Sequence, residues 1–261
     1  MNHLLKKNGY LVKKFSNKKL LKISRDIIKK YFNKKQDYYL KLSREKFHNL
    51  ALRCQNKLNK ANLQKIFNEN EKNFLKELFK TDDYLYSSII TLRVVRPRNK
   101  KTNGEQIGWH RETFYGKNKY IKDAINIWIP VLNISKDNAL GIIPGSHLID
   151  DKKIIRKRFK YKDYKIKKFS SAHKLGFPYS PKKIVSGINL GTEKKIYVKS
   201  NFFMVFSQML VHGNAENRSN KIRFAINLGL ISKTKLTRNR IINKKKFKLK
   251  NKKNQLYIRV N

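Results

Sequence analysis

The chain has 261 residues and carries 63 Lys and Arg residues against 17 Asp and Glu residues, a formal net charge of +46. Its hydrophobic fraction of 39% supports a sizeable core and excludes a wholly disordered chain, and its single cysteine, Cys54, excludes an intramolecular disulfide and a cysteine-based zinc site. The apolar runs are too short to span a bilayer and the amino terminus lacks the apolar stretch of a signal peptide, so we expect a cytoplasmic protein without a membrane partner.

Apolar residues in the first third of the chain recur at helical spacing. One stripe lies in Leu20–Tyr31, and a second lies in Phe47–Leu58, for which Ser43 is a suitable N-cap. A third stripe follows in Leu63–Leu78. These stripes predict an N-terminal helical region over residues 1–83, with the apolar faces packed against a core.

Short strands separated by turns are expected from Tyr84 onward. The segments are rich in β-branched and aromatic residues or alternate between apolar and polar ones, and they comprise 87–95, 124–132, 196–198, 202–206 and 222–228. Helices first and strands afterwards predict an α+β fold. Many short strands favour a sandwich or a barrel.

Two of these strands combine an apolar face with a sparse polar face. Asn126 and Trp128 share the polar face of 124–132, and Arg223 lies on the polar face of 222–228. This pattern suggests a barrel with a working interior. Asn126 would there contact a co-substrate or substrate, or alternatively satisfy the barrel backbone.

His110 and Glu112 are two residues apart, so in extended backbone their side chains point to the same side. Together with His212, a hundred residues later, they match the two-histidine, one-carboxylate set that binds non-haem iron(II) and leaves three coordination positions open. A buried hydrogen-bonded histidine, or an ion pair among His110, Arg111 and Glu112, would give the same pattern. His147 follows Pro-Gly-Ser in a predicted tight turn, where we expect a structural role.

Arg223 follows His212 by eleven residues, on the polar face of its strand. Two antiparallel strands joined by a loop would bring both residues into one interior. A guanidinium there would hold the distal carboxylate of a dicarboxylic co-substrate in a bidentate pair. The alternative is a structural salt bridge at the mouth of the barrel.

The segment from about Ile89 to Ile231 resembles the phytanoyl-CoA dioxygenase family of iron(II)- and 2-oxoglutarate-dependent oxygenases. The resemblance rests on the order and spacing of short motifs over more than half of the chain. These motifs are Trp109–Tyr115 (WHRETFY), Ile127–Val131 (IWIPV), Asn138–His147 (NALGIIPGSH), Phe206–Asn214 (FSQMLVHGN), Asn217–Ser219 (NRS) and Arg223.

The resemblance implies a double-stranded β-helix, a jelly-roll barrel, with helices packed outside it. It implies that His110, Glu112 and His212 are the iron ligands. Arg223 would bind the C5 carboxylate of 2-oxoglutarate, and Trp128 would lie against that co-substrate. The implied reaction uses O2 to hydroxylate a small molecule while 2-oxoglutarate is oxidatively decarboxylated to succinate and CO2.

The chain departs from the family pattern in three places. Glu112 stands where the family usually has Asp; it offers the same ligand group, and its presence argues against halogenation. Ala225 stands where many relatives have a hydroxyl residue, so a second donor to the C5 carboxylate must come from elsewhere. The basic insertion 152–168 within the core 84–232, and the basic tail 233–261, are not family features.

The positive charge is concentrated in these two additional segments. Residues 152–168 hold ten basic residues and one acid, and residues 233–261 hold twelve basic residues and no acid, whereas 84–150 hold ten and five. Basic walls at an active-site mouth would favour an anionic substrate. The same segments support a nucleic-acid-associated protein as one alternative. A non-catalytic binding protein on the same scaffold is the other.

Overall fold

The computed structural model describes residues 3–87, 89–98, 108–112, 123–158, 182–213, 216–232 and 257–258. The α-helices among them all lie in the first third of the chain: α1 (His3–Asn8), α2 (Lys19–Tyr31), α3 (Gln36–Lys41), α4 (Arg44–Asn59), α5 (Leu63–Asn70) and α6 (Lys72–Phe79). The strands are β1 (Tyr10–Lys14), β2 (Tyr84–Ser87), β3 (Thr91–Val95), β4 (Ile125–Leu132), β5 (Leu140–Ile142), β6 (Ile155–Arg158), β7 (Lys182–Ser186), β8 (Lys194–Ile196), β9 (Phe202–Ser207), β10 (His212–Gly213), β11 (Arg223–Ser232) and β12 (Tyr257–Ile258).

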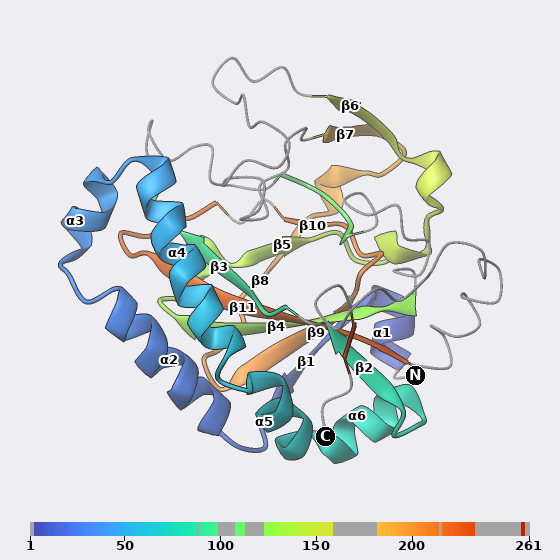
Figure 1. Ribbon diagram of the computed structural model, residues 1–261. Helices are drawn as coiled ribbons and strands as arrows, with labels where there is room; N and C mark the ends of the chain where they lie inside the picture. Colours follow the sequence, from blue (N-terminus) through green and yellow to red (C-terminus); the bar gives the residue numbers. More distant parts are fainter. Residues whose placement is uncertain are drawn as a thin grey trace, which may run out of the picture.

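Helices α2 and α4 cover one face of the larger sheet (Figure 1). Helix α4 begins where the sequence predicts, because the Ser43 side chain accepts a hydrogen bond from the backbone N–H of Lys46. The apolar stripes face inward, and Ile28 of α2 and Phe47 of α4 belong to the same buried cluster as Ile127 of β4. This outer core attaches the helical layer to the sheet.

The larger sheet is antiparallel and has the strand order β1-β9-β4-β11-β2-β12, with β3 also paired to β11. Alternate residues of β4, β9 and β11 point away from the helices into a second buried cluster, which includes Trp128, Met204, Phe206 and Ala225. The predicted polar face of β4 and β11 is therefore the inner face of this sheet.

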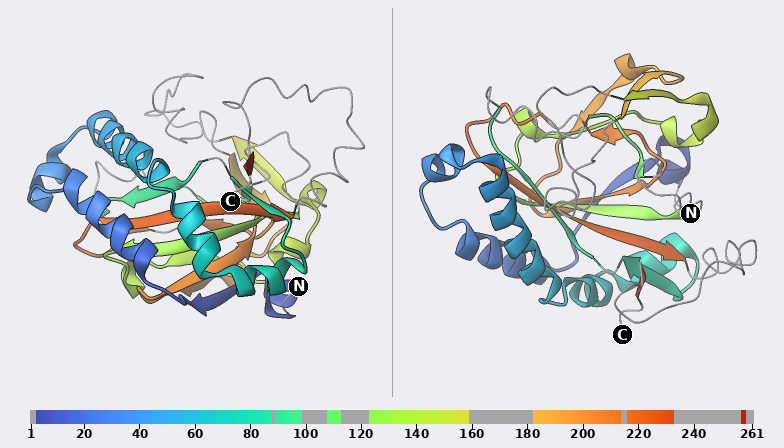
Figure 2. Two further views of the ribbon diagram at one scale, coloured as in Figure 1. Left: turned by 60° about the horizontal axis from the view of Figure 1, so that its bottom comes forward. Right: turned by 45° about the horizontal axis from the view of Figure 1, so that its top comes forward.

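A second antiparallel sheet, β10-β5-β8, lies against that inner face. Leu140 and Ile142 of β5 complete the inner cluster from this side. Beyond the small sheet, β6 and β7 form a two-stranded hairpin, far from α2 and α4 in two views (Figures 1 and 2). Ile154 and Ile184, at the base of the hairpin, pack with Val211, beside β10. The inner cluster therefore lies between two sheets, and β10 belongs to the smaller one.

The mixed arrangement of helices and antiparallel sheets is as predicted, but strand β1 is not. It is a short lysine-containing strand at the sheet edge, and its five residues give no pattern that distinguishes it from a loop. The predicted strand over 87–95 is two strands, since β2 ends at Ser87 and β3 begins at Thr91.

Two other predicted features are affected by the sheet topology. Strand β10, which carries His212, pairs with β5 of the smaller sheet, whereas Arg223 begins β11 of the larger sheet, so the two residues come from different sheets. Within the basic tail, β12 pairs with β2, while 233–256 and 259–261 lie outside the described residues, as do 159–168 of the insertion. Among the described helices, none has the length and apolarity needed to cross a membrane.

Candidate metal centre

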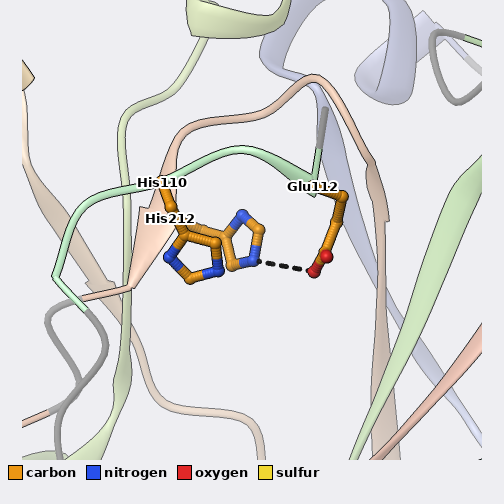
Figure 3. A group of neighbouring side chains, drawn as sticks. All are labelled: His110, Glu112 and His212. Atoms are coloured by element: carbon orange, nitrogen blue, oxygen red, sulfur yellow. Dashed lines mark ion pairs between the residues drawn. The ribbon is translucent and has the colours of Figure 1, made fainter. Parts of the chain in front are cut away.

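His110 and His212 lie side by side because their backbones form an isolated antiparallel bridge. The N–H of His110 donates to the carbonyl of His212 at 2.9 Å, and the N–H of His212 donates to the carbonyl of His110 at 3.0 Å. The two ring centroids are 4.3 Å apart, and both side chains are buried. The carboxylate of Glu112 faces the ring of His212, as Figure 3 shows. Residues distant in sequence therefore converge at one point.

Backbone carbonyls determine which ring nitrogen of each histidine faces this point. Nδ1 of His110 lies 2.8 Å from the carbonyl oxygen of Gly108, and Nδ1 of His212 lies 2.9 Å from that of Leu210. A carbonyl can only accept, so each Nδ1 carries the proton and each Nε2 keeps its lone pair. One ligand atom from each histidine and one carboxylate oxygen of Glu112 all lie within 4.8 Å of one another. The donor set and its orientation fit a divalent transition metal.

The carboxylate of Glu112 has two direct neighbours, and a third residue supports it indirectly. Its Oε1 lies 3.5 Å from Nε2 of His212 and accepts a hydrogen bond from Nδ2 of Asn126 at 3.1 Å. Gln208 in turn donates from Nε2 to Oδ1 of Asn126 at 2.9 Å, and its carbonyl accepts from the N–H of Glu112 at 3.1 Å. The amide of Asn126 is thereby oriented with its donor toward the carboxylate.

The surroundings set the protonation states that a metal requires. Burial, reinforced by the neighbouring His212, lowers the pKa of His110 to about 3. Burial by itself would raise the pKa of Glu112. In its protonated form His212 donates a hydrogen bond and adds a positive charge, which outweigh burial and, with the charges of His110 and Arg93, lower the pKa of Glu112 to about 2. At neutral pH His110 is neutral and Glu112 is an anion, as metal ligands must be.

Arg223 enters the same interior from the start of β11. Its side chain is buried, and Nη1 donates to the carbonyl oxygen of Asn138 at 2.7 Å. Asn138 is fixed in turn, because its Nδ2 donates to Oδ1 of Asn217 at 3.3 Å. Burial and the charge of Arg93 lower the pKa of Arg223 to about 10, so it remains a cation at neutral pH. No described carboxylate forms an ion pair with it.

The turn that contains Ser146 joins both ligand-bearing segments. Its carbonyl accepts a hydrogen bond from the guanidinium of Arg111, which also pairs with Asp151. Its hydroxyl accepts from the N–H of Val211 at 2.8 Å. His147 of the same turn bonds through Nε2 to the carbonyl of Lys6 and lies outside the ligand group. Arg111 therefore points away from Glu112, so the expected alternative of an ion pair among His110, Arg111 and Glu112 is wrong.

Comparison with known proteins identifies the family of this chain and solved structures of similar fold. The family model described as "Phytanoyl-CoA dioxygenase (PhyH)" matches residues 6–225, which is most of the chain. The chain belongs to the phytanoyl-CoA dioxygenase family. No curated protein sequence matches it.

Several solved structures are similar to this family member in fold. EvdO2 from Micromonospora carbonacea var. aurantiaca, complexed with 2-oxoglutarate, matches with a TM-score of 0.55 and 11% identity over 89% of this chain and 91% of that one. The non-heme monooxygenase ThoJ matches with a TM-score of 0.53 and 12% identity over 88% and 76%. The non-heme alpha-ketoglutarate-dependent carbocyclase SnoK from nogalamycin biosynthesis gives 0.50 and 12% over 88% and 82%.

Of the residues singled out from the sequence of this phytanoyl-CoA dioxygenase family member, Trp128 lies in the inner cluster, and Asn126 contacts Glu112. The motif residues 113–115 and Asn214 lie outside the described residues. Sequence reasoning missed Gln208, although it stands in the matched FSQMLVHGN motif. It also missed Arg93, a charged residue between two buried apolar ones on a strand, which is the signal that could have revealed it.

Proposed function

We propose that this protein is an iron(II)- and 2-oxoglutarate-dependent dioxygenase that hydroxylates a small, anionic metabolite. The observation that carries the proposal is the convergence of His110, Glu112 and His212, with both Nε2 lone pairs directed at one point and Arg223 in the same interior. Membership of the phytanoyl-CoA dioxygenase family supports it. EvdO2, which resembles this chain in fold, has been crystallised with 2-oxoglutarate.

In this proposal His110, Glu112 and His212 hold iron(II), which supplies open coordination positions for the 2-oxo acid and for O2. The positively charged Arg223 binds the C5 carboxylate and fixes the direction in which 2-oxoglutarate lies. Trp128 provides an apolar wall that keeps water from the co-substrate. One O2, one 2-oxoglutarate and one substrate C–H give succinate, CO2 and a hydroxylated product.

The orientation of the ligands is the protein's own contribution to this chemistry. The carbonyls of Gly108 and Leu210 keep the protons of the two imidazoles on Nδ1, away from the metal position. Asn126 directs its amide at the carboxylate of Glu112, which keeps the carboxylate in place before any metal binds. These contacts suit a site that binds the metal without rearranging.

We infer that the two facing sheets are the two halves of a double-stranded β-helix. The architecture then consists of a helical region over 1–83 that also supplies strand β1, an oxygenase core over 84–232, and a basic tail over 233–261. The inner cluster between the sheets supports this organisation, because Trp128 and Ala225 belong to it, and Asn126 and Arg223 lie on the same faces of their strands. A cytoplasmic location is part of the same proposal.

Anaerobic addition of iron(II) and then 2-oxoglutarate, followed by visible absorbance, tests the function. We expect a charge-transfer band in the wild type that His212→Ala abolishes while circular dichroism shows an unchanged fold. His147→Gln is the matched control, because His147 lies outside the ligand group, and it should keep the band. Folded wild-type protein without a band would contradict the oxygenase proposal.

Formation of succinate separates an enzyme from a binding protein on the same scaffold. With ascorbate supplied to reduce the second oxygen atom of O2 to water, we expect slow succinate and CO2 release from 2-oxoglutarate without substrate, at a rate that His212→Ala removes. A band without any succinate would favour the binding protein. Hydroxylation is tested by product mass, because structures of similar fold include a carbocyclase and the epimerase SnoN. A product heavier by one oxygen atom supports the hydroxylase.

A further inference from the structure

Arg93 points into the interior that holds the proposed metal site. Its neighbours on β3, Leu92 and Val94, belong to the outer core beneath the helices, so the alternation of a strand directs Arg93 to the inner face. Directly across the ladder it faces Ala225, which lies in the inner cluster with Trp128. Strand β3 runs beside β11 in Figure 1. Arg93 is half-buried there.

Arg223 is the diagonal neighbour of Arg93 across the same ladder. Its own direct partner is Val95, two residues beyond Arg93, and the two arginines therefore share one face. Diagonal pairs of this kind lie about 7–8 Å apart at the backbone, within the combined reach of two long side chains. Ala225 stands between them and extends only a methyl group, so it offers neither guanidinium a polar partner.

The two cations lie on one face of the sheet without a described carboxylate as partner. Among the described residues neither Arg93 nor Arg223 forms an ion pair with a carboxylate, and Arg223 bonds to a backbone carbonyl instead. Their charges oppose each other, since Arg93 contributes to the lowered pKa of Arg223. The field of Arg93 also reaches His110 and Glu112. Two like charges close together in a protein interior are unfavourable unless an anion joins them.

We propose that Arg93 and Arg223 together bind the distal C5 carboxylate of 2-oxoglutarate, with Arg93 as the second donor beside Ala225. A planar guanidinium matches a carboxylate, and two guanidiniums can saturate its oxygens. The distal end of 2-oxoglutarate is the one assigned, because Arg93 lies only two residues along β3 from Val95, the direct partner of Arg223. This inference rests on the proposed function, and the experiment below separates the failure of each.

The test compares two 2-oxo acids that differ only at the distal end. 2-Oxopentanoate has the same five-carbon chain as 2-oxoglutarate but a methyl group in place of the C5 carboxylate. Both are titrated anaerobically into iron(II)-loaded protein, and the charge-transfer band gives the dissociation constants. We expect Arg93→Met to weaken 2-oxoglutarate by about ten- to a hundredfold and to leave 2-oxopentanoate nearly unchanged, as expected for one lost charge-assisted pair.

Arg25→Met is the matched control, because Arg25 is a half-buried arginine of α2 that bonds to the carbonyl of Val131 on the other side of the sheet. It should change neither affinity. Arg93→Lys keeps the positive charge but loses the paired N–H donors of the planar guanidinium. It should give a smaller loss of 2-oxoglutarate affinity. It is the variant to use if Arg93→Met is not folded by circular dichroism.

The outcomes are distinct. No band from wild-type protein with either acid contradicts the proposed function itself. A normal wild-type band with the same affinity for 2-oxoglutarate in the Arg93 variants contradicts only the role of Arg93 and points to the anionic substrate as its ligand. Equal weakening of both acids also overturns the proposal, because it places the effect of Arg93 at the 2-oxo acid end.

Discussion

At the scale of single residues, the two histidines owe their orientation to a short local contact. In each, Nδ1 bonds to the carbonyl two residues earlier in the chain, Gly108 for His110 and Leu210 for His212. The backbone bridge between the two histidines then brings the rings together. The backbone therefore fixes both the tautomer of each histidine and the separation of the two rings. In the neutral imidazoles, each Nε2 is then available to the proposed metal.

The side chain of Asn126 bonds to Glu112 and to Gln208, and these contacts lead to a prediction about the proposed metal site. Its amide donates to Glu112 and accepts from Gln208, so Asn126→Ala removes the group that orients the carboxylate. We expect iron(II) affinity to fall about ten- to a hundredfold, the usual effect of losing a residue that supports a ligand. Competition with a metal-binding dye measures it.

The same variant distinguishes this role from direct contact with the co-substrate. If Asn126 acts only through Glu112, Asn126→Ala saturated with iron should keep the wild-type ratio of affinities for 2-oxoglutarate and 2-oxopentanoate. Asn133→Ala is the control, because Asn133 donates to the carbonyl of Ile222, the residue just before β11. This variant should keep wild-type iron affinity. Unchanged iron affinity in Asn126→Ala would contradict the orienting role.

At the scale of elements, the turn around Ser146 connects the two segments that carry the ligands. One side of the turn receives Arg111, next to His110, and the other receives the N–H of Val211, next to His212. Ile143, just before the turn, donates its N–H to the carbonyl of Val211 at 2.9 Å. A change in this turn is thus transmitted to both histidines through their immediate neighbours.

Ser146→Ala should therefore weaken both the fold and the metal site. It leaves the buried N–H of Val211 without its acceptor, which costs about 1–3 kcal/mol in the free energy of unfolding. We expect a loss of iron(II) affinity in addition, measured by dye competition. Ser43→Ala is the matched control: it removes the N-cap of α4 at about 1 kcal/mol and should leave iron affinity intact. Equal iron affinity in both variants would show that the turn does not position the ligands.

The elements also show what the sequence could and could not predict. The stripe of α4 and the alternation of β4 were sufficient to predict a helix and a two-faced strand, because each pattern repeats over many residues. The role of His110, Glu112 and His212 as iron ligands stays a prediction that rests on the family motifs, and only their choice as a candidate set was predictable from the sequence. The pairing of β10 with β5 was not, since two residues carry no periodicity and long-range pairing depends on the whole fold.

At the scale of the whole molecule, the proposed site and the excess charge occupy different parts of the chain. Every residue assigned here to iron or 2-oxoglutarate lies between Arg93 and Arg223, whereas the tail 233–261 holds twelve basic residues and no acid. The described part of the insertion, 152–158, contains β6, which pairs with β7, and Ile154 and Ile184 at the base of this pair pack with Val211. This pair of strands is therefore a basic element next to the segment that carries His212, and we expect it to favour an anionic substrate.

This separation leads to a prediction about nucleic acid. Removal of residues 233–261 lowers the formal net charge from +46 to +34 and should weaken binding to duplex DNA without altering the charge-transfer band. Binding by the full chain should fall by about a hundredfold or more between 50 and 200 mM salt and show no sequence preference, because it would consist of contacts to phosphate. Fluorescence anisotropy with two unrelated duplexes measures both properties.

A second variant controls for the loss of β12, which pairs with β2 and is removed by the truncation. Replacing six tail lysines by glutamine keeps the strand and removes only charge: Lys244, Lys245, Lys246, Lys248, Lys250 and Lys252. It should weaken DNA binding in proportion to the charge removed and flatten the salt dependence. Tight, sequence-selective binding that survives both variants and high salt would mean that nucleic acid is a specific ligand of the core, and the substrate would then have to be sought among nucleic acids rather than small anions.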